Sequence, residues 1–153
     1  MSAKHYEGKV NGVWASILSH HLPLSEGYVH RPQDKVRKGF SDISSVHWVQ
    51  RPGKPDLQQC RFLITQCKRP GKEKRGSTWF AAQDQLAKYL RRRPATWDHK
   101  TFGIVAIGRW VKFYELNAAR KQLLQLGKDR PYHIIEDAEK VVEMLDYIKA
   151  NHQ

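Results

Sequence analysis

Apolar residues recur at helical spacing in three parts of the chain, which predicts amphipathic helices over residues 3–21, 78–92 and 136–151. Pro23 and Pro94 follow the first two segments and are expected to end them. The residues expected to face inward are Tyr6, Val10, Val13, Trp14, Ile17 and Leu18 in the first helix, Trp79, Ala82, Leu86, Tyr89 and Leu90 in the second, and Ala138, Val141, Leu145 and Ile148 in the third.

Between these helices, four apolar or alternating runs predict two β-hairpins. Residues 41–49 pair with residues 60–68 across the turn sequence RPGKPD, and residues 102–108 pair with residues 110–116 across Gly108-Arg109. The order helix, hairpin, helix, hairpin, helix predicts an α/β (or α+β) fold with a small mixed β-sheet flanked by helices on both faces. A loop is expected over residues 24–39 and a partly helical excursion over residues 117–130.

Composition narrows the class of protein. With 153 residues, 40% hydrophobic and 27% charged, the chain is expected to form one globular domain over residues 1–153. No apolar run approaches the ~20 residues of a membrane-spanning helix. The first ten residues lack the apolar core of a secretory signal, so we expect an intracellular protein, cytoplasmic or nuclear. Cys60 and Cys67 would lie about 20 Å apart on an extended strand, beyond disulfide reach, which suits a reducing compartment.

The net charge of +12 makes a polyanion the first partner to consider. A soluble basic protein with solvated lysines is the alternative, and charge alone does not decide between them. Anionic lipid would need a basic amphipathic helix with an aromatic apolar face, which residues 3–21 offer only weakly. We therefore expect a nucleic-acid partner and no membrane partner.

The strand sequence FLITQCKRP carries a polar pair at its end. Side chains two residues apart on a strand share a face, so Gln66 and Lys68 are expected on one side of the sheet and Cys67 on the other. An antiparallel hairpin brings its outer ends together, which places Asp42 close to this pair. Glu7 falls on the apolar stripe of the first helix, where a carboxylate is costly unless it is paired or bound to a cation.

An acid, an amide oxygen and an ammonium group at one end of a sheet suit metal-assisted hydrolysis of phosphodiesters. Mg²⁺ or Mn²⁺ takes oxygen ligands, which Asp42 and the Gln66 carbonyl can supply. Lys68 can then orient or deprotonate the attacking water, or neutralise charge on the pentavalent phosphate.

These residues resemble the PD-(D/E)xK nuclease superfamily, the restriction-endonuclease-like fold. The resemblance implies Asp42 as the first acid, Gln66-Cys67-Lys68 as the D/E-x-K triplet and Glu7 as the helix acid that completes the metal site. The family usually has Asp or Glu where this chain has Gln66. Ser41-Asp42 with Gln66-Cys67-Lys68 is similar to the subtype that carries Q-C-K or N-C-K after an upstream Ser-Asp or Thr-Asp.

Two further features extend the resemblance across most of the chain. Gln85-Leu86-Ala87-Lys88-Tyr89 is similar to the Q-x-x-x-Y motif of RecB-like members, which implies that Gln85 and Tyr89 position the substrate. The strand pair FGIVAIGRWVKFYEL is similar to the fourth and fifth strands of such nucleases. Basic residues on both sides of the second helix can track phosphates, and Trp79 or Trp97 can stack on an unpaired base. The basic residues are Lys72, Lys74, Arg75, Arg91, Arg92 and Arg93.

The sequence therefore predicts a Mg²⁺-dependent nuclease acting on DNA in preference to RNA. With no room for a separate specificity domain, we expect weak sequence preference, or structure selectivity, or a partner that supplies targeting. The protein partners to consider are a second copy of the chain and a targeting protein. Asp56, in a literal Pro-Asp dipeptide, is a second candidate for the first acid. Each site residue also has an ordinary interpretation: Lys68 as a solvated strand end, Glu7 as a surface acid, and Gln85 and Tyr89 as a helix edge. The alternative functions are an impaired nuclease fold that binds nucleic acid or protein, and a domain that binds protein only. The segment KRPGKEKR also fits a nuclear-import signal.

Overall fold

The computed structural model describes residues 3–37, 40–92, 100–117 and 122–152, with side chains for residues 9–32, 42–92, 100–116 and 122–152. The helices are α1 (Ala3–His21), α2 (Gly76–Arg91) and α3 (Ala138–Asn151), with a short 3-10 helix η1 (Leu24–Glu26). The strands are β1 (Tyr28–Arg37), β2 (Phe40–Val49), β3 (Gln58–Lys68), β4 (Thr101–Ile107), β5 (Trp110–Asn117), β6 (Gln122–Leu126) and β7 (Tyr132–His133). The three predicted helices and the four predicted strands are all present within about two residues of their expected ends.

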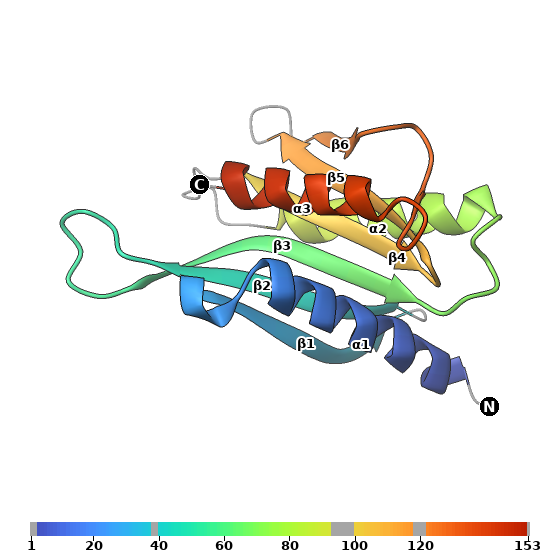
Figure 1. The fold of residues 1–153 in the computed structure, drawn as a ribbon, viewed down its shortest axis with the longest axis horizontal. Helices are drawn as coiled ribbons and strands as arrows, with labels where there is room; N and C mark the ends of the chain where they lie inside the picture. The colour runs from blue at the N-terminus through green and yellow to red at the C-terminus, as the bar shows by residue number, and fades with distance from the viewer. Residues whose placement is uncertain (1–2, 38–39, 93–99, 118–121, 153) are drawn as a thin grey trace.

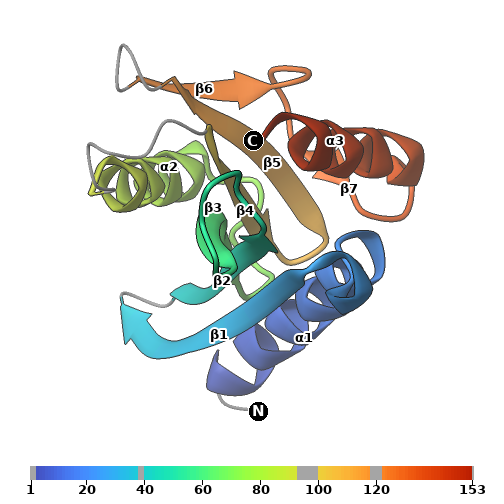
Figure 2. The same cartoon turned by 90° about the vertical axis from the view of Figure 1, so that its left-hand side faces the viewer.

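The strands form one open sheet in the order β1-β2-β3-β4-β5-β6, and β7 pairs with the beginning of β5. Neighbouring strands are antiparallel except β3 and β4, which are parallel. A parallel pair needs a crossover connection, and α2 lies in it. Figures 1 and 2 show α1 and α3 over one face of the sheet and α2 over the other. The predicted α/β class, with a mixed sheet between helices, is confirmed.

The sheet has two faces, here called the α1/α3 face and the α2 face after the helices that cover them. Each face has its own hydrophobic core. On the α1/α3 face, residues of both helices pack on strand residues such as Ile43 and Phe113. On the α2 face, the helix packs on Ile64, Val105 and Tyr114. The buried helix residues are Val10, Trp14 and Leu18 of α1, Trp79, Ala82, Leu86 and Leu90 of α2, and Val141, Leu145 and Ile148 of α3.

Two residues predicted to face inward do not. Val13 is 45% exposed, because the buried line of α1 runs through every fourth residue, and Val13 is turned about 100° from Trp14. Ala138 is exposed because it is the first residue of α3, ahead of the turn that packs. Tyr89 is only half-buried, on the edge of the α2 stripe, and the side chain of Tyr6 lies outside the described residues.

Two strands lie where the sequence analysis expected other structures. The loop predicted over residues 24–39 is wrong, because β1 pairs with β2 from Tyr28 to Gln33. The helical excursion predicted over residues 117–130 is also wrong, because β6 pairs with β5 there. Both are outer strands of the sheet (Figure 2). Outer strands tolerate Pro, charge and polar side chains, since one of their hydrogen-bonding edges faces away from the sheet.

A glycine seats α2 on the sheet. Gly103 lies in β4, and a Cβ atom there would collide with the side chain of Leu86, which is fully buried. The helix therefore approaches the strand more closely than any side chain larger than hydrogen would permit. This contact fixes the height of α2 over the strands that carry the candidate site.

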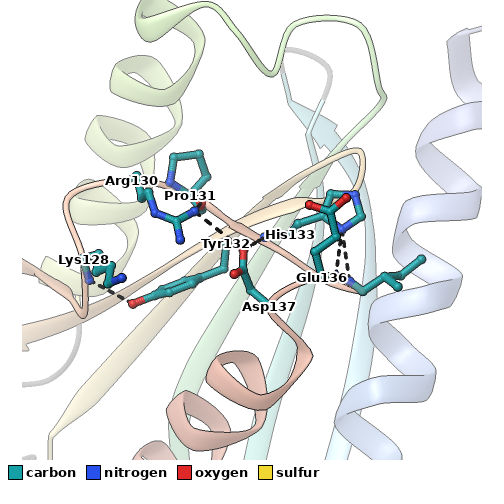
Figure 3. Close-up of polar contacts among 8 residues, drawn as sticks. Lys128, Arg130, Pro131, Tyr132, His133, Glu136 and Asp137 are labelled. Atoms are coloured by element: carbon teal, nitrogen blue, oxygen red, sulfur yellow. Dashed lines mark hydrogen bonds and ion pairs between the residues drawn. The ribbon is translucent and has the colours of Figure 1, made fainter.

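The segment before α3 is held by its own polar contacts (Figure 3). The Tyr132 hydroxyl accepts the Lys128 N–H at 2.9 Å, and the Asp137 carboxylate accepts the His133 N–H at 2.8 Å. His133 Nδ1 accepts the N–H groups of Ile135 and Glu136, each at 3.2 Å. These bonds fix the turn that leads into α3.

Among the described residues, no helix is both long enough and apolar enough to cross a membrane.

Candidate active site

The β2–β3 register places Asp42 directly opposite Gln66. Residues opposite each other in an antiparallel pair point to the same face, with Cβ atoms about 4.5–5.5 Å apart. Lys68 follows two residues later on the same face and is half-buried at the end of β3. Asp42 is 4% exposed and Gln66 is fully buried. The acid, the amide and the lysine thus meet at one end of the sheet, as the hairpin geometry predicts.

The site lies on the α2 face. Ile64, two residues before Gln66, belongs to the core under α2, so Gln66 and Lys68 project to that side. Cys67 projects to the opposite side, into the core under α1 and α3. Burial, together with the negative charge of Asp42, raises the pKa of the Cys67 thiol well above its usual range. Cys67 is therefore a buried structural thiol and not a nucleophile.

The Gln66 side chain is buried with neither amide atom hydrogen-bonded: Oε1 and Nε2 both lack a partner. Leaving a buried polar group unsatisfied costs about 1–3 kcal/mol. An amide oxygen of this kind beside the Asp42 carboxylate is the donor set that a hard divalent cation takes. Within the described residues, no cluster of three or more His, Cys, Asp or Glu could hold a metal. The two oxygen donors therefore fit a cation that takes its remaining ligands from water and phosphate.

The helix acid of the predicted site, Glu7, belongs to the first turns of α1, and its side chain lies outside the described residues. The helix packs on the face opposite α2. Its N-terminal end lies toward the end of the sheet where β3 finishes (Figure 1). The backbone therefore brings Glu7 to the same end of the sheet as Lys68, on the other face.

Gln85 and Tyr89 are half-buried and lie one turn apart on α2. The opposite flank of the helix faces β6, where Phe80, Gln83, Ala87 and other residues line a groove with Gln122 and Leu123. Because β6 and β3 lie on opposite sides of β4 and β5, the Gln85–Tyr89 flank is the one on the β3 side. That flank is the one nearer to Gln66.

The predicted basic residues form two groups at the two ends of α2. Lys72 is half-buried and Lys74 and Arg75 are exposed before the helix, while Arg91 and Arg92 are exposed at its end. The helix has 16 residues and is about 24 Å long. The groups therefore flank the helix at separate points. Arg93 and Trp97 lie outside the described residues.

The suggestion that Trp79 stacks on a nucleic-acid base is wrong. Its side chain is 6% exposed and belongs to the core under α2. Its indole N–H donates to the Glu73 carbonyl at 2.7 Å, and Lys112 Nζ lies 5.2 Å from the ring centre. The tryptophan is thus a core residue that anchors the loop before α2. The prediction from helical spacing that Trp79 faces inward was correct. A side chain buried in this way cannot also stack on a base.

Sequence analysis missed a second lysine on the same face. Gln66 pairs with Val105 and Val105 pairs with Lys112, so Asp42, Gln66, Val105 and Lys112 form one row across four strands. Strands are about 4.8 Å apart, which puts the Lys112 Cα about 10 Å from that of Gln66. The signal was present in WVKFYEL, because Lys112 alternates with Tyr114 and Leu116, both buried under α2.

The alternative acid, Asp56, lies in the turn between β2 and β3, where it is exposed and its backbone carbonyl accepts the Gln58 amide at 3.2 Å. That turn is at the end of the hairpin opposite Gln66. Asp56 therefore does not meet the other site residues.

No protein-family model matches the chain, and neither a curated protein nor a solved structure matches it.

Proposed function

We propose that the chain is a metal-dependent nuclease of the PD-(D/E)xK type that hydrolyses phosphodiester bonds, of DNA in preference to RNA. The observation that carries the proposal is the buried Gln66 amide, without a hydrogen-bond partner, directly opposite Asp42 and two residues before Lys68. A buried polar group is normally satisfied, so an unsatisfied one beside a carboxylate supports a bound cation.

Asp42 and the Gln66 carbonyl would hold Mg²⁺ or Mn²⁺ on the α2 face. The resemblance implies Glu7 as a further acid, and from α1 on the other face it would have to reach the ion around the end of the sheet. Such an ion supplies a Lewis acid and lowers the pKa of water. Lys68, half-buried at the end of β3, orients the water or neutralises charge on the phosphate. Gln85 and Tyr89 position the backbone of the substrate, and the two basic groups around α2 attract it. The net charge of +12 supports a polyanionic substrate.

The test is cleavage of supercoiled plasmid, single-stranded DNA and RNA of matched sequence, with Mg²⁺ or Mn²⁺ and with a chelator. Asp42→Asn and Lys68→Ala are expected to lose cleavage while still binding DNA. Lys54→Ala is the matched control, because Lys54 is an exposed lysine in the hairpin turn at the far end of β3. Cleavage that survives both site substitutions would contradict the proposal.

A second function rests on Gln66 itself, because a neutral amide holds a cation less strongly than a carboxylate. In that case the fold binds nucleic acid or a protein partner without cleaving. The same assay separates the two, since it would show binding without cleavage in every variant. Binding to phosphates weakens steeply as salt rises, whereas binding that is insensitive to salt would favour a protein partner.

A further inference from the structure

His47 and His152 form a hydrogen-bonded pair at the other end of β2. His47 Nδ1 lies 2.9 Å from Nε2 of His152, the residue that follows α3. His152 is fully buried and His47 is half-buried. His47 is five positions after Asp42, about 17 Å along the strand. The pair is therefore distinct from the candidate active site, and the inference below does not depend on the proposed function.

The outer nitrogens of both rings face backbone carbonyls. His47 Nε2 lies 3.0 Å from the Glu26 carbonyl, and His152 Nδ1 lies 3.0 Å from the Ile148 carbonyl. A carbonyl oxygen only accepts, so both of these nitrogens must carry hydrogen. A neutral imidazole has one N–H, and its other nitrogen is an acceptor. Two neutral rings would therefore turn two lone pairs toward each other across 2.9 Å.

Three hydrogen bonds need three ring protons, and two neutral imidazoles have only two. We propose that His47 and His152 share one additional proton, forming a singly protonated dyad that fastens the residue after α3 to β2. A zinc ion is not an equivalent bridge. Two nitrogens bound to tetrahedral zinc at about 2.0–2.1 Å lie about 3.3 Å apart. The observed separation is shorter than that.

The surroundings disfavour a second extra proton. The Tyr28 ring stacks on His47 with centroids 4.0 Å apart, and the Phe62 ring lies 4.3 Å from that of His152. Burial lowers the pKa of His47 below its usual value, although the Glu26 carbonyl and carboxylate act in the opposite direction. A second extra proton would put two imidazolium rings 5.0 Å apart. In the part of the chain that the structure describes, the charged and titratable groups around the dyad include Glu26 of η1, Tyr28 of β1, Cys60 of β3 and Lys149 of α3, the last bonded to Glu26 at 2.9 Å.

Another histidine of the same protein provides a contrast. His133 Nδ1 accepts two backbone N–H groups, from Ile135 and Glu136 (Figure 3). One acceptor nitrogen satisfies both bonds, so a neutral ring suffices and no proton is missing. His133→Asn is therefore a matched control for a substitution in the dyad.

The first measurement counts ring protons by NMR on the intact chain with ¹⁵N-labelled histidine at pH 7.5. A free imidazole is about 90% neutral there. We expect three N–H protons on the four nitrogens of His47 and His152, one of them shared. Two neutral rings with one broken hydrogen bond would overturn the proposal. This measurement needs no variant, so it decides the matter even if a substituted chain does not fold.

The second measurement follows the folding equilibrium constant between pH 6.5 and 8.5 in the wild type, His152→Asn and His133→Asn. If the native dyad keeps a proton that the unfolded histidines have lost, stability falls as pH rises, by up to tenfold per pH unit for one proton. We expect that slope in the wild type and in His133→Asn, and its absence in His152→Asn. Equal slopes in all three chains would overturn the proposal.

Discussion

The two ends of the β2–β3 hairpin bury polar side chains in opposite ways. At the Asp42 end, the Gln66 amide is fully buried and neither of its polar atoms has a hydrogen-bond partner. At the His47 end, every ring nitrogen of the histidine pair faces a partner, and the bonds outnumber the protons of two neutral rings. The difference separates two uses of buried polarity. The histidine bonds tie separate elements together, whereas the unsatisfied Gln66 amide is the basis of the proposed cation site.

The largest expected effect concerns the proposed metal site at the Asp42 end. Gln66→Glu replaces a neutral oxygen with a charged one, and the charge of the ligand set tunes affinity for a hard cation. We expect the Mg²⁺ concentration for half-maximal cleavage to fall about tenfold or more. Mn²⁺ binding without DNA, followed by calorimetry, checks the same change independently of activity. Unchanged metal affinity would remove Gln66 from the metal site.

The His47 end should lose stability when its bonds are removed. His47→Phe keeps a ring against Tyr28 but removes the hydrogen bonds to His152 Nε2 and to the Glu26 carbonyl. We expect the free energy of unfolding to fall by about 2–3 kcal/mol, as measured by urea denaturation at pH 7. His20→Phe, at an exposed histidine of α1, is the control. A loss in the control equal to that in His47→Phe would show that the pair contributes nothing specific.

At the Asp42 end, removing the polar group is expected to raise the free energy of unfolding when a chelator is present. Gln66→Leu removes two unsatisfied polar atoms from the interior and adds apolar surface. We expect the metal-free protein to become more stable by about 1–3 kcal/mol, while cleavage is lost. Urea denaturation in EDTA measures the gain in stability, and plasmid cleavage with Mg²⁺ measures the loss of activity. Destabilisation without metal would mean that the Gln66 amide is satisfied in solution.

A smaller effect is expected at alkaline pH. Burial raises the pKa of Tyr28 to about 12, and the Glu26 carboxylate acts in the same direction. The unfolded tyrosine ionises near pH 10, so the unfolded state gains charge first. The contribution of Tyr28 to stability is thus full below pH 10 and declines as pH rises toward 12. Tyrosinate absorbance and thermal unfolding across this range measure the shift, and Tyr28→Phe should remove it.

The interior strands and the helices were predictable because their buried positions carry apolar residues, in short runs in the strands and at helical spacing in the helices. β4 is a largely apolar run that is buried throughout, β3 carries the apolar segment Phe62-Leu63-Ile64, and the stripe of α2 matches its buried residues. The pairing of Asp42 with Gln66 followed from strand parity and the position of one turn. β1 and β6 were missed because outer strands tolerate proline and polar residues, such as Pro32 and Gln122, which local pattern does not separate from loops.

Features that depend on distant parts of the chain could not be predicted. His47 and His152 are far apart in sequence, and only the docking of α3 beside η1 and β2 brings them together. The lack of partners for Gln66 likewise depends on all the side chains that surround it. Lys112 was predictable in part. Strand alternation indicates which face of the sheet it lies on, but only the order of the strands places it in the same row as Gln66.

The close packing of Leu86 of α2 on Gly103 also has a consequence for folding kinetics. The β2–β3 and β4–β5 pairs are hairpins of neighbouring segments, and hairpins form in about 1–10 μs. The parallel β3–β4 pair joins them only after the chain has crossed over through α2, which makes it the non-local and slower step. Leu86→Ala weakens the contact that accompanies this joining. We expect stopped-flow measurements to show slower folding with little change in the unfolding rate, because the two hairpins meet at Gly103 before the rest of the sheet is complete.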